Sequence, residues 1–400
     1  MGCCCFKKKK PNTSYIKGQE EQGQELSEKE LASTKKSPID DYEIKKKLSK
    51  LSSGAFGQVF LVRLKSTGEL FAMKKISKSK TNIEDAQKER DIWIKVKSPF
   101  VANIKEAFQD EGNVYLISEY APGKDLRLLW AEKKIFNIEW TKFYIAELVV
   151  ALDDLHSKNI IHRDIKLENI LIDSKGHIKL TDFGVSKILN NNEKAKTMVG
   201  TVSYVAPEIA SGKRYDKAVD WWSLGVVMFV LLEGNFPFEM FNYTAKNFTL
   251  TFNKITDENA KGLIQKFLTV NPEKRIGSGE DGINEIKNHP FFVGIDWDKA
   301  KNRKLKPPFV PKKEKNKVKK PKKSSENVTY LDDYGDGYEG FFYASKTFKD
   351  NVPNFIIDKK KDGNNDDQIK DDDNNNEVEG TKDNDNSEKL LVNENIKNYQ

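Results

Sequence analysis

The residues of this chain best suited to chemistry lie in two short motifs that together could transfer a phosphoryl group. The first is His162-Arg163-Asp164-Ile165-Lys166-Leu167-Glu168-Asn169, and the second is Asp182-Phe183-Gly184. Asp164 supplies a carboxylate that can accept a hydroxyl proton, and Lys166 a cation that can steady a phosphoryl group. Asn169 and Asp182 carry the oxygen ligands that Mg²⁺ prefers. Either tripeptide alone would recur by chance, whereas the two motifs at this spacing are specific.

Apolar runs flank both motifs and predict the elements that hold them. Ile160-Ile161 precedes the first motif, and Ile170-Leu171-Ile172 and Ile178-Lys179-Leu180 lie between the two. This pattern predicts two loops mounted on short buried strands. The arrangement resembles the catalytic and magnesium loops of protein kinases. The resemblance implies an α+β bilobal fold, with a small β-rich N-lobe and a larger helical C-lobe.

A stretch near the start of the expected N-lobe resembles the glycine-rich loop that closes over ATP phosphates. It comprises Leu51, Ser52, Ser53, Gly54, Ala55, Phe56, Gly57, Gln58 and Val59. Glycine is needed in such a loop because a Cβ would block the approach of backbone N–H groups to phosphate. Ser52 replaces the first glycine of the family pattern. Taken alone, the loop can also be read as a surface hairpin.

The resemblance assigns further residues to the nucleotide site. Lys74, which ends the alternating run Phe71-Ala72-Met73-Lys74, is expected to contact the phosphates. Glu89, in the charged amphipathic stretch 82–96, is its expected partner, although a surface carboxylate is the alternative. Val59, Ala72 and Leu171 are expected to sandwich adenine, or to be ordinary core. The backbone groups of Glu119 and Ala121 are expected to hydrogen-bond the adenine.

The activation segment is expected to end at Gly200-Thr201-Val202-Ser203-Tyr204-Val205-Ala206-Pro207-Glu208. Arg275 is the expected ion-pair partner of Glu208, and Asp220 is expected to begin a central buried helix. Thr197 lies where related kinases carry an activating phosphate, which Arg163 and Lys187 are expected to grip. Thr201 is the competing position, but we expect it to bond Asp164 and Lys166.

The chain after the kinase-like region resembles the tail of the AGC group. The resembling stretch extends from His289-Pro290-Phe291-Phe292 to Pro307-Pro308-Phe309-Val310-Pro311. Tyr338-Glu339-Gly340-Phe341-Phe342-Tyr343 resembles that group's hydrophobic motif, with Phe342 in place of Ser or Thr. Tyr338 and Phe341 are therefore expected to dock beside the helix that carries Glu89, without a phosphate.

Length and composition support this organisation. We predict a leader at 1–41, a kinase domain at 42–292 divided after residue 120, a tail at 293–345 and a disordered segment at 346–400. No apolar run reaches the roughly 18 residues of a membrane helix, and no apolar region follows the N-terminal lysines as in a signal peptide. The only three cysteines are adjacent at the N-terminus, which excludes a disulfide framework or cysteine–zinc site in the body of the chain.

The N-terminus predicts a membrane anchor. Gly2 can carry a myristoyl chain and Cys3, Cys4 and Cys5 can carry palmitoyl chains, beside four lysines that suit an anionic leaflet. Phe6 departs from the myristoylation pattern, which prefers Ser or Thr there, and a disordered basic leader is the alternative. The expected location is cytoplasmic, on the inner face of the plasma membrane or on endomembranes.

Charge is divided unevenly along the chain. Residues 358–400 carry 13 acidic and 7 basic side chains, a charge of −6. Because the net charge of the chain is +7, residues 1–357 carry +13. Eight lysines at 312–323 form a basic run that we read as a solvated linker or a second contact with a polyanion. No readout motif supports nucleic acid as a partner.

Three functions compete at this stage: an active kinase, a nucleotide-binding pseudokinase and a structural membrane adaptor. The intact Lys74, Asp164, Asn169 and Asp182 favour an active kinase that uses ATP and Mg²⁺. The loop containing Lys166 implies Ser/Thr specificity. Asp125 and Glu168 match acidic positions that bind a substrate arginine three residues before the acceptor, whereas Val230 replaces a further acidic position. Protein substrates with basic residues before the acceptor and an upstream activating kinase are the expected partners.

Overall fold

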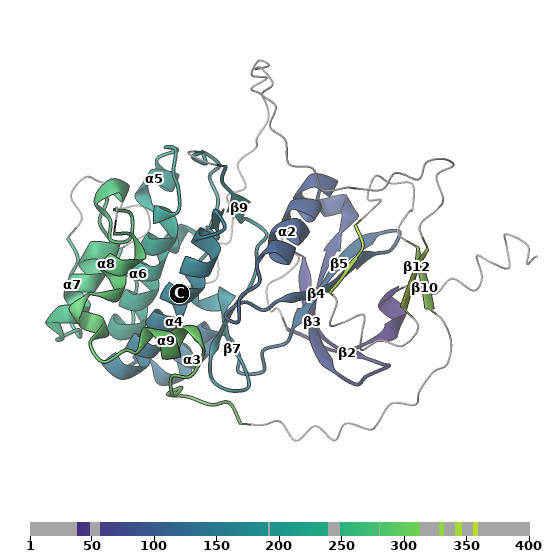
Figure 1. Cartoon of the computed structure of the whole chain (residues 1–400), viewed down its shortest axis with the longest axis horizontal. Coiled ribbons are helices and arrows are strands. Elements are labelled where there is room, and N and C mark those ends of the chain that lie inside the picture. The colour runs from purple at the N-terminus through teal and green to yellow at the C-terminus, as the bar shows by residue number, and fades with distance from the viewer. Residues whose placement is uncertain are drawn as a thin grey trace, which may run out of the picture.

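The computed structural model describes residues 38–48, 57–190, 193–238, 249–279, 281–312 and 341–345, together with the backbone of residues 328–331 and 355–358. Figure 1 shows two lobes, one built on a sheet and one built of helices. This arrangement confirms the predicted bilobal α+β fold. The predicted lipidation sites, the basic run at 313–323, Tyr338 and most of the glycine-rich loop lie outside the described residues.

The N-lobe is a six-stranded sheet covered on one face by a helix. The strands are β1 (Tyr42–Lys47), β2 (Gln58–Leu64), β3 (Leu70–Ser77), β4 (Ile104–Gln109), β5 (Asn113–Glu119) and β11 (Tyr343–Ala344), in the order β1-β2-β3-β5-β4-β11. All neighbours pair antiparallel. Helix α2 (Ile83–Lys95) begins at Asn82, whose side chain accepts a hydrogen bond from Asp85 N. A short 3₁₀ helix, η1 (Pro38–Asp41), precedes β1.

The C-lobe is built around one helix that is buried along its whole length. Its helices are α3 (Leu126–Lys133), α4 (Ile138–His156), α5 (Pro207–Ala210), α6 (Ala218–Glu233), α7 (Glu258–Phe267), α8 (Ile283–Lys287) and α9 (Trp297–Lys301). All sixteen residues of α6 are buried, so the helix has no polar face. A Cβ on Gly225 would lie 2.6 Å from Phe267 Cβ, which shows how closely α6 and α7 approach.

Short strands at the junction of the lobes support the loops of interest. The 3₁₀ turn η3 (Leu167–Asn169) leads into β7 (Ile170–Ile172), which pairs with β8 (Ile178–Leu180). Strand β6 (Ile160–Ile161) pairs with β9 (Lys187–Ile188). Strands β6, β7 and β8 are the buried strands that the apolar runs predict, whereas β9 is half-buried and was not predicted. The two catalytic motifs therefore emerge from the same small scaffold.

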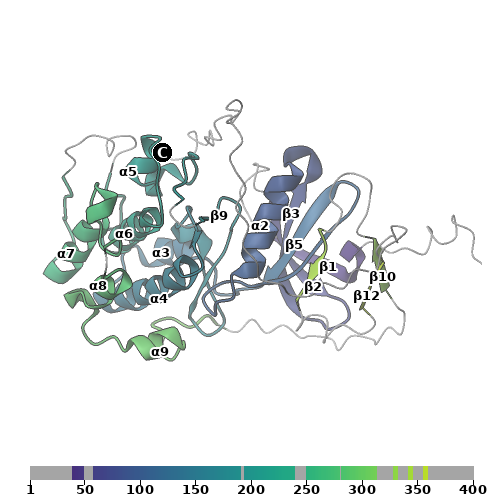
Figure 2. The same cartoon turned by 45° about the horizontal axis from the view of Figure 1, so that its top comes forward.

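The tail returns to the N-lobe and completes its sheet. Strand β11 pairs with β4, and Ser345 N donates a 2.8 Å hydrogen bond to Lys105 O. Two further strands, β10 (Val328–Leu331) and β12 (Phe355–Asp358), pair in parallel at the outer side of the N-lobe (Figures 1 and 2). Within the described ranges, no helix is both long and apolar enough to cross a membrane.

Candidate active site

Lys74 connects the sheet, helix α2 and the Asp182 loop. Its Nζ lies 2.6 Å from Glu89 Oε1 and 3.0 Å from Asp182 Oδ1. Burial works to lower the pKa of Lys74, but the carboxylates of Asp182 and Glu89 outweigh it and raise that pKa above its ordinary value. Burial likewise opposes the charge of Asp182, yet the Lys74 ammonium holds the pKa of that carboxyl group below its usual range. Lys74 and Asp182 therefore remain charged at neutral pH.

Asp164 is held by a network of its own. Its Oδ1 accepts hydrogen bonds from the Thr201 hydroxyl at 2.7 Å and from Thr201 N at 3.1 Å. Its Oδ2 accepts from Lys166 Nζ at 2.6 Å and from Asn169 Nδ2 at 3.0 Å. Lys166 Nζ also donates to the Thr201 hydroxyl at 2.8 Å. Thr201 thus makes the two contacts expected of it, and a single orientation of the Asp164 carboxylate is enforced.

The fully buried carboxylate of Asp220 holds the backbone of the loop that carries Asp164. Asp220 accepts hydrogen bonds from His162 N at 3.0 Å and Arg163 N at 2.9 Å. His156 Nε2 lies 2.8 Å from the same carboxylate. Arg163 adopts a φ of +66°, which few non-glycine residues adopt. The sequence predicts only that Asp220 begins a helix, which in the structure begins at Ala218, and it carries no local signal for this anchoring role.

His162 couples the two motifs. Burial lowers the pKa of His162, so its ring is neutral. Nε2 then donates to Thr181 O at 3.2 Å, while Nδ1 accepts from Asp164 N at 3.3 Å. Phe183 is fully buried and its ring lies 5.2 Å from the ring of His162 and 5.7 Å from that of Trp93 in α2. Helix α2, the Asp182 loop and the Asp164 loop therefore form one packed unit.

The residues expected around adenine are spread over both lobes. Val59 in β2, Ala72 in β3 and Leu171 in β7 each keep part of their surface accessible. The residues on either side of Ala72 and Leu171 are buried, whereas those beside Val59 are also partly accessible. Glu119 ends β5 and binds Lys105 at 3.0 Å and Lys179 at 2.7 Å through its side chain, so only its backbone suits adenine. Ala121 lies in the segment between the lobes and is buried. Because these three apolar residues are partly exposed, contact with adenine is favoured over ordinary packing in the core.

A family model of the protein kinase domain matches residues 45–292. The chain belongs to the protein kinase family. Similar curated proteins are ribosomal protein S6 kinase alpha-6 of Danio rerio (43% identical) and ribosomal protein S6 kinases alpha-3 (41%) and alpha-1 (43%) of Homo sapiens. The matches cover 66%, 74% and 66% of this chain. They cover 37%, 42% and 38% of those relatives, so the chain spans about two fifths of their length. These findings confirm the resemblance to AGC-group serine/threonine kinases.

The kinase's activation segment carries an exposed Thr197. The Tyr215 hydroxyl donates to Thr197 O at 2.7 Å and accepts from Arg163 Nη1 at 3.0 Å. Arg163 also donates to the Val185 and Ser186 carbonyl groups. Lys187, the second expected phosphate partner, pairs with Glu193 at 2.7 Å. Arg163 is thus connected to Thr197 through the Tyr215 hydroxyl, whereas Lys187 contacts Glu193, and both cations already have partners.

The expected ion pair behind this segment is present. Arg275 Nη1 and Nη2 lie 2.7 and 3.0 Å from the two carboxylate oxygens of Glu208, and both residues are buried. Arg275 also lies over the Trp222 ring. Breaking such a buried pair by removing one partner typically costs about 3–5 kcal/mol. The pair therefore fixes the end of the activation segment to the C-lobe.

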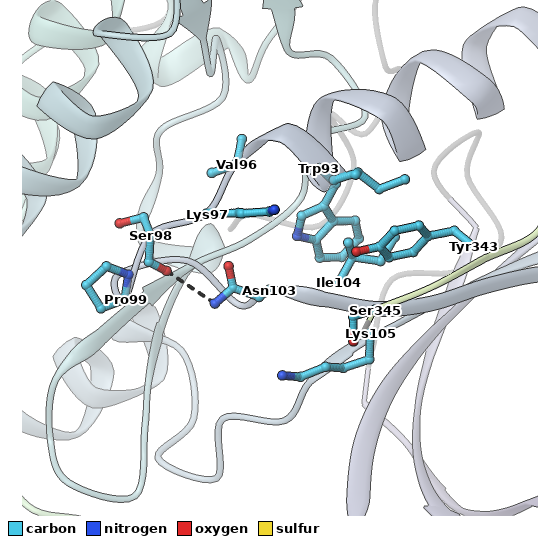
Figure 3. A pocket seen from close by; sticks show the side chains of 11 residues that line it. Trp93, Val96, Lys97, Ser98, Pro99, Asn103, Ile104, Lys105, Tyr343 and Ser345 are labelled. Atoms are coloured by element: carbon cyan, nitrogen blue, oxygen red, sulfur yellow. Dashed lines mark hydrogen bonds between the residues drawn. The ribbon is translucent and has the colours of Figure 1, made fainter. Parts of the chain in front are cut away.

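Phe341 of the tail docks beside α2 as the hydrophobic-motif resemblance predicts, whereas Tyr338, the other expected contact, lies outside the described residues. Phe341 is fully buried, with Arg90 of α2 5.1 Å above its ring. Phe342 packs against a second apolar cluster that includes Tyr42 and Phe108. Figure 3 shows the neighbouring cavity of about 330 Å³, where Tyr343 and Ser345 of the tail face Trp93, Lys97 and Lys105. Tail and α2 therefore share one packed region.

Proposed function

We propose that the chain is an active ATP-dependent serine/threonine kinase that prefers basic residues before the acceptor and works at a membrane surface. One observation supports this proposal above the others. Lys74 hydrogen-bonds to both Glu89 and Asp182. Lys166 and Asn169 form a second hydrogen-bond network around Asp164. A pseudokinase or a structural adaptor has no use for both networks.

The residues fit magnesium and ATP. Asn169 uses its amide nitrogen for Asp164, so its amide oxygen is the atom available to coordinate a cation. The ionised Asp182 is the second oxygen ligand, and oxygen ligands are those that Mg²⁺ prefers. Gly57 has a φ of +80° and a Cβ there would lie 2.5 Å from Lys75 O, so the loop requires glycine at this point.

When bound, ATP and Mg²⁺ supply the γ-phosphoryl group and neutralise its charge. Lys74, fixed by Glu89, binds the nucleotide phosphates. Asp164 orients the substrate hydroxyl and receives its proton, because Thr201 and Asn169 hold the carboxylate in place. Lys166 lies beside Asp164 and steadies the group in transfer. Alignment and charge neutralisation are the main needs of phosphoryl transfer.

Transfer of radiolabelled phosphate from ATP to a basic peptide tests the activity. Wild type should label the peptide on serine or threonine, and Asp164→Asn should lower the rate by a factor of about 10²–10⁴, typical for loss of a general base. Nucleotide binding without transfer in both proteins would instead identify a pseudokinase. Absence of both nucleotide binding and phosphoryl transfer would favour a structural adaptor.

The membrane proposal rests on Gly2, Cys3, Cys4, Cys5 and the adjacent lysines, at the cytoplasmic face of the plasma membrane or endomembranes. Two acyl signals, or one with a basic patch, are needed for stable anchoring. Metabolic labelling with alkyne-tagged myristate and palmitate should mark wild type, and Gly2→Ala should lose the myristoyl label and move to the soluble fraction. Equal membrane fractions for both proteins would overturn the anchor.

A further inference from the structure

An arginine of the chain itself contacts an acidic residue beside the catalytic loop. Arg127 Nε lies 3.2 Å from Glu168 Oε1. Glu168 is in η3, two residues after Lys166, and Arg127 is in the first turn of α3. Asp125 begins that helix and uses Oδ1 to cap Leu128 N. Two carboxylates and one guanidinium therefore share this corner, which leaves a net negative charge.

The contact between Arg127 and Glu168 is incomplete. Their side chains are 42% and 35% exposed, and a single nitrogen–oxygen distance joins them. The other oxygen, Glu168 Oε2, is buried, and no donor within the described residues hydrogen-bonds to it. An unpartnered carboxylate oxygen is costly, so the site favours a further or better-placed cation.

The position of Glu168 indicates where such a cation would come from. Glu168 follows Asp164 by four residues, a span of roughly 10 Å in a loop and 3₁₀ turn. Three residues of an extended peptide also cover about 10 Å. A substrate whose hydroxyl meets Asp164 can therefore bring the side chain three positions earlier to Glu168. A guanidinium that displaces Arg127 can present two N–H groups to the Glu168 carboxylate, whereas Arg127 reaches it with one nitrogen.

We propose that Arg127 is a specificity-determining residue, which occupies Glu168 in competition with a substrate arginine and so weakens the selection of arginine three residues before the acceptor. The inference rests on the proposed kinase function. Exposed ion pairs are weak, so the substrate guanidinium displaces Arg127 at a modest cost. Removing Arg127 should strengthen selection by about twofold to fivefold, the factor that such a pair represents.

Two peptides that differ only in arginine or alanine at that position test the proposal. The ratio of their kcat/KM values is measured for wild type, Arg127→Leu and Arg127→Lys. Arg127→Leu should raise the ratio through a lower KM for the arginine peptide, since Arg127 does not touch the reacting atoms. The kcat/KM ratio of Arg127→Lys should lie between those of wild type and Arg127→Leu. Lys124→Leu is the matched control, because Lys124 pairs with Glu132 and not with Glu168.

Binding of the same peptides with alanine at the acceptor position supplies a readout that needs no turnover. The arginine peptide should bind Arg127→Leu more tightly than wild type, and this gain should vanish when Glu168→Gln is added. An unchanged or lower preference in Arg127→Leu would overturn the proposal. Absence of turnover in every protein would overturn the kinase function instead, while the binding experiment still decides the role of Arg127.

Discussion

The Tyr42 hydroxyl donates a 2.5 Å hydrogen bond to Oε2 of Glu106, a carboxyl group buried in β4 whose backbone pairs with Ala344 of the tail. Burial raises the pKa of Glu106 to about 8; the Tyr42 bond opposes that rise and the nearby Asp41 adds to it. Glu106 is therefore protonated in the folded protein at neutral pH. An uncharged acid at this point suits the apolar surroundings of the docked tail.

This carboxyl group should make stability fall as pH rises. Between pH 4.5, its ordinary pKa, and about 8, the folded state keeps a proton that the unfolded state releases. The free energy of unfolding then declines by at most about 1.4 kcal/mol per pH unit in that window. Glu106→Gln keeps an acceptor for Tyr42 without the ionisation, so its melting temperature should exceed that of wild type at pH 8 and match it near pH 5. A constant difference in melting temperature between the two proteins from pH 5 to pH 8 would contradict the raised pKa of Glu106.

Docking of the tail should support both stability and activity. Phe341 is fully buried, and burial of such an aromatic side chain contributes on the order of 1.5–3 kcal/mol. Truncation after Asp336 removes it, which should lower the melting temperature and loosen α2, and hence the Lys74–Glu89 pair. Truncation after Asp358 keeps β11 and β12 and serves as the control. Equal melting temperature and kcat in the two truncated proteins would show that the tail does not act on α2.

Phosphorylation of Thr197 should activate the kinase. The phosphate adds a charge of about −1.5 to −2 at Thr197. The Tyr215 hydroxyl donates to the Thr197 carbonyl group and accepts a hydrogen bond from Arg163. Arg163 would then exchange neutral carbonyl partners for a charged one, which is a stronger interaction. Thr197→Ala should lower kcat by about tenfold relative to phosphorylated wild type, measured on one peptide. Full activity of Thr197→Ala, with phosphate found on Thr201 by mass spectrometry, would assign regulation to the other threonine.

Ser118 should admit bulky ligands behind adenine. Its side chain is buried in β5, opposite Ala72 of β3, and a serine leaves space there that a larger side chain would fill. A C3-substituted pyrazolopyrimidine should inhibit wild type and Ser118→Ala alike. Ser118→Met should resist the compound while it retains most of its ATP turnover. Equal inhibition of wild type and Ser118→Met would show that the side chain at position 118 does not decide whether bulky ligands enter.

The local motifs were readable from the sequence because each needs only neighbouring residues. The Asp164 loop and the strands around it follow from short apolar runs that bracket polar residues. The fold class follows from the same motifs and from their resemblance to protein kinases. Lys74 and Glu89 were paired by that resemblance, since the spacing of two charged residues does not reveal a contact between a strand and a helix.

Tertiary packing alone decided the environments of several charged residues. No local pattern in β4 marks Glu106 as buried, and the fold places its carboxyl group against the Tyr42 hydroxyl, in a strand that pairs with the tail. Asp220 begins a helix in the sequence, yet the fold places it under His162 and Arg163. Arg127 meets Glu168 because α3 packs against η3. A side chain's charge is local, but its pKa and its partner depend on segments far away in the chain.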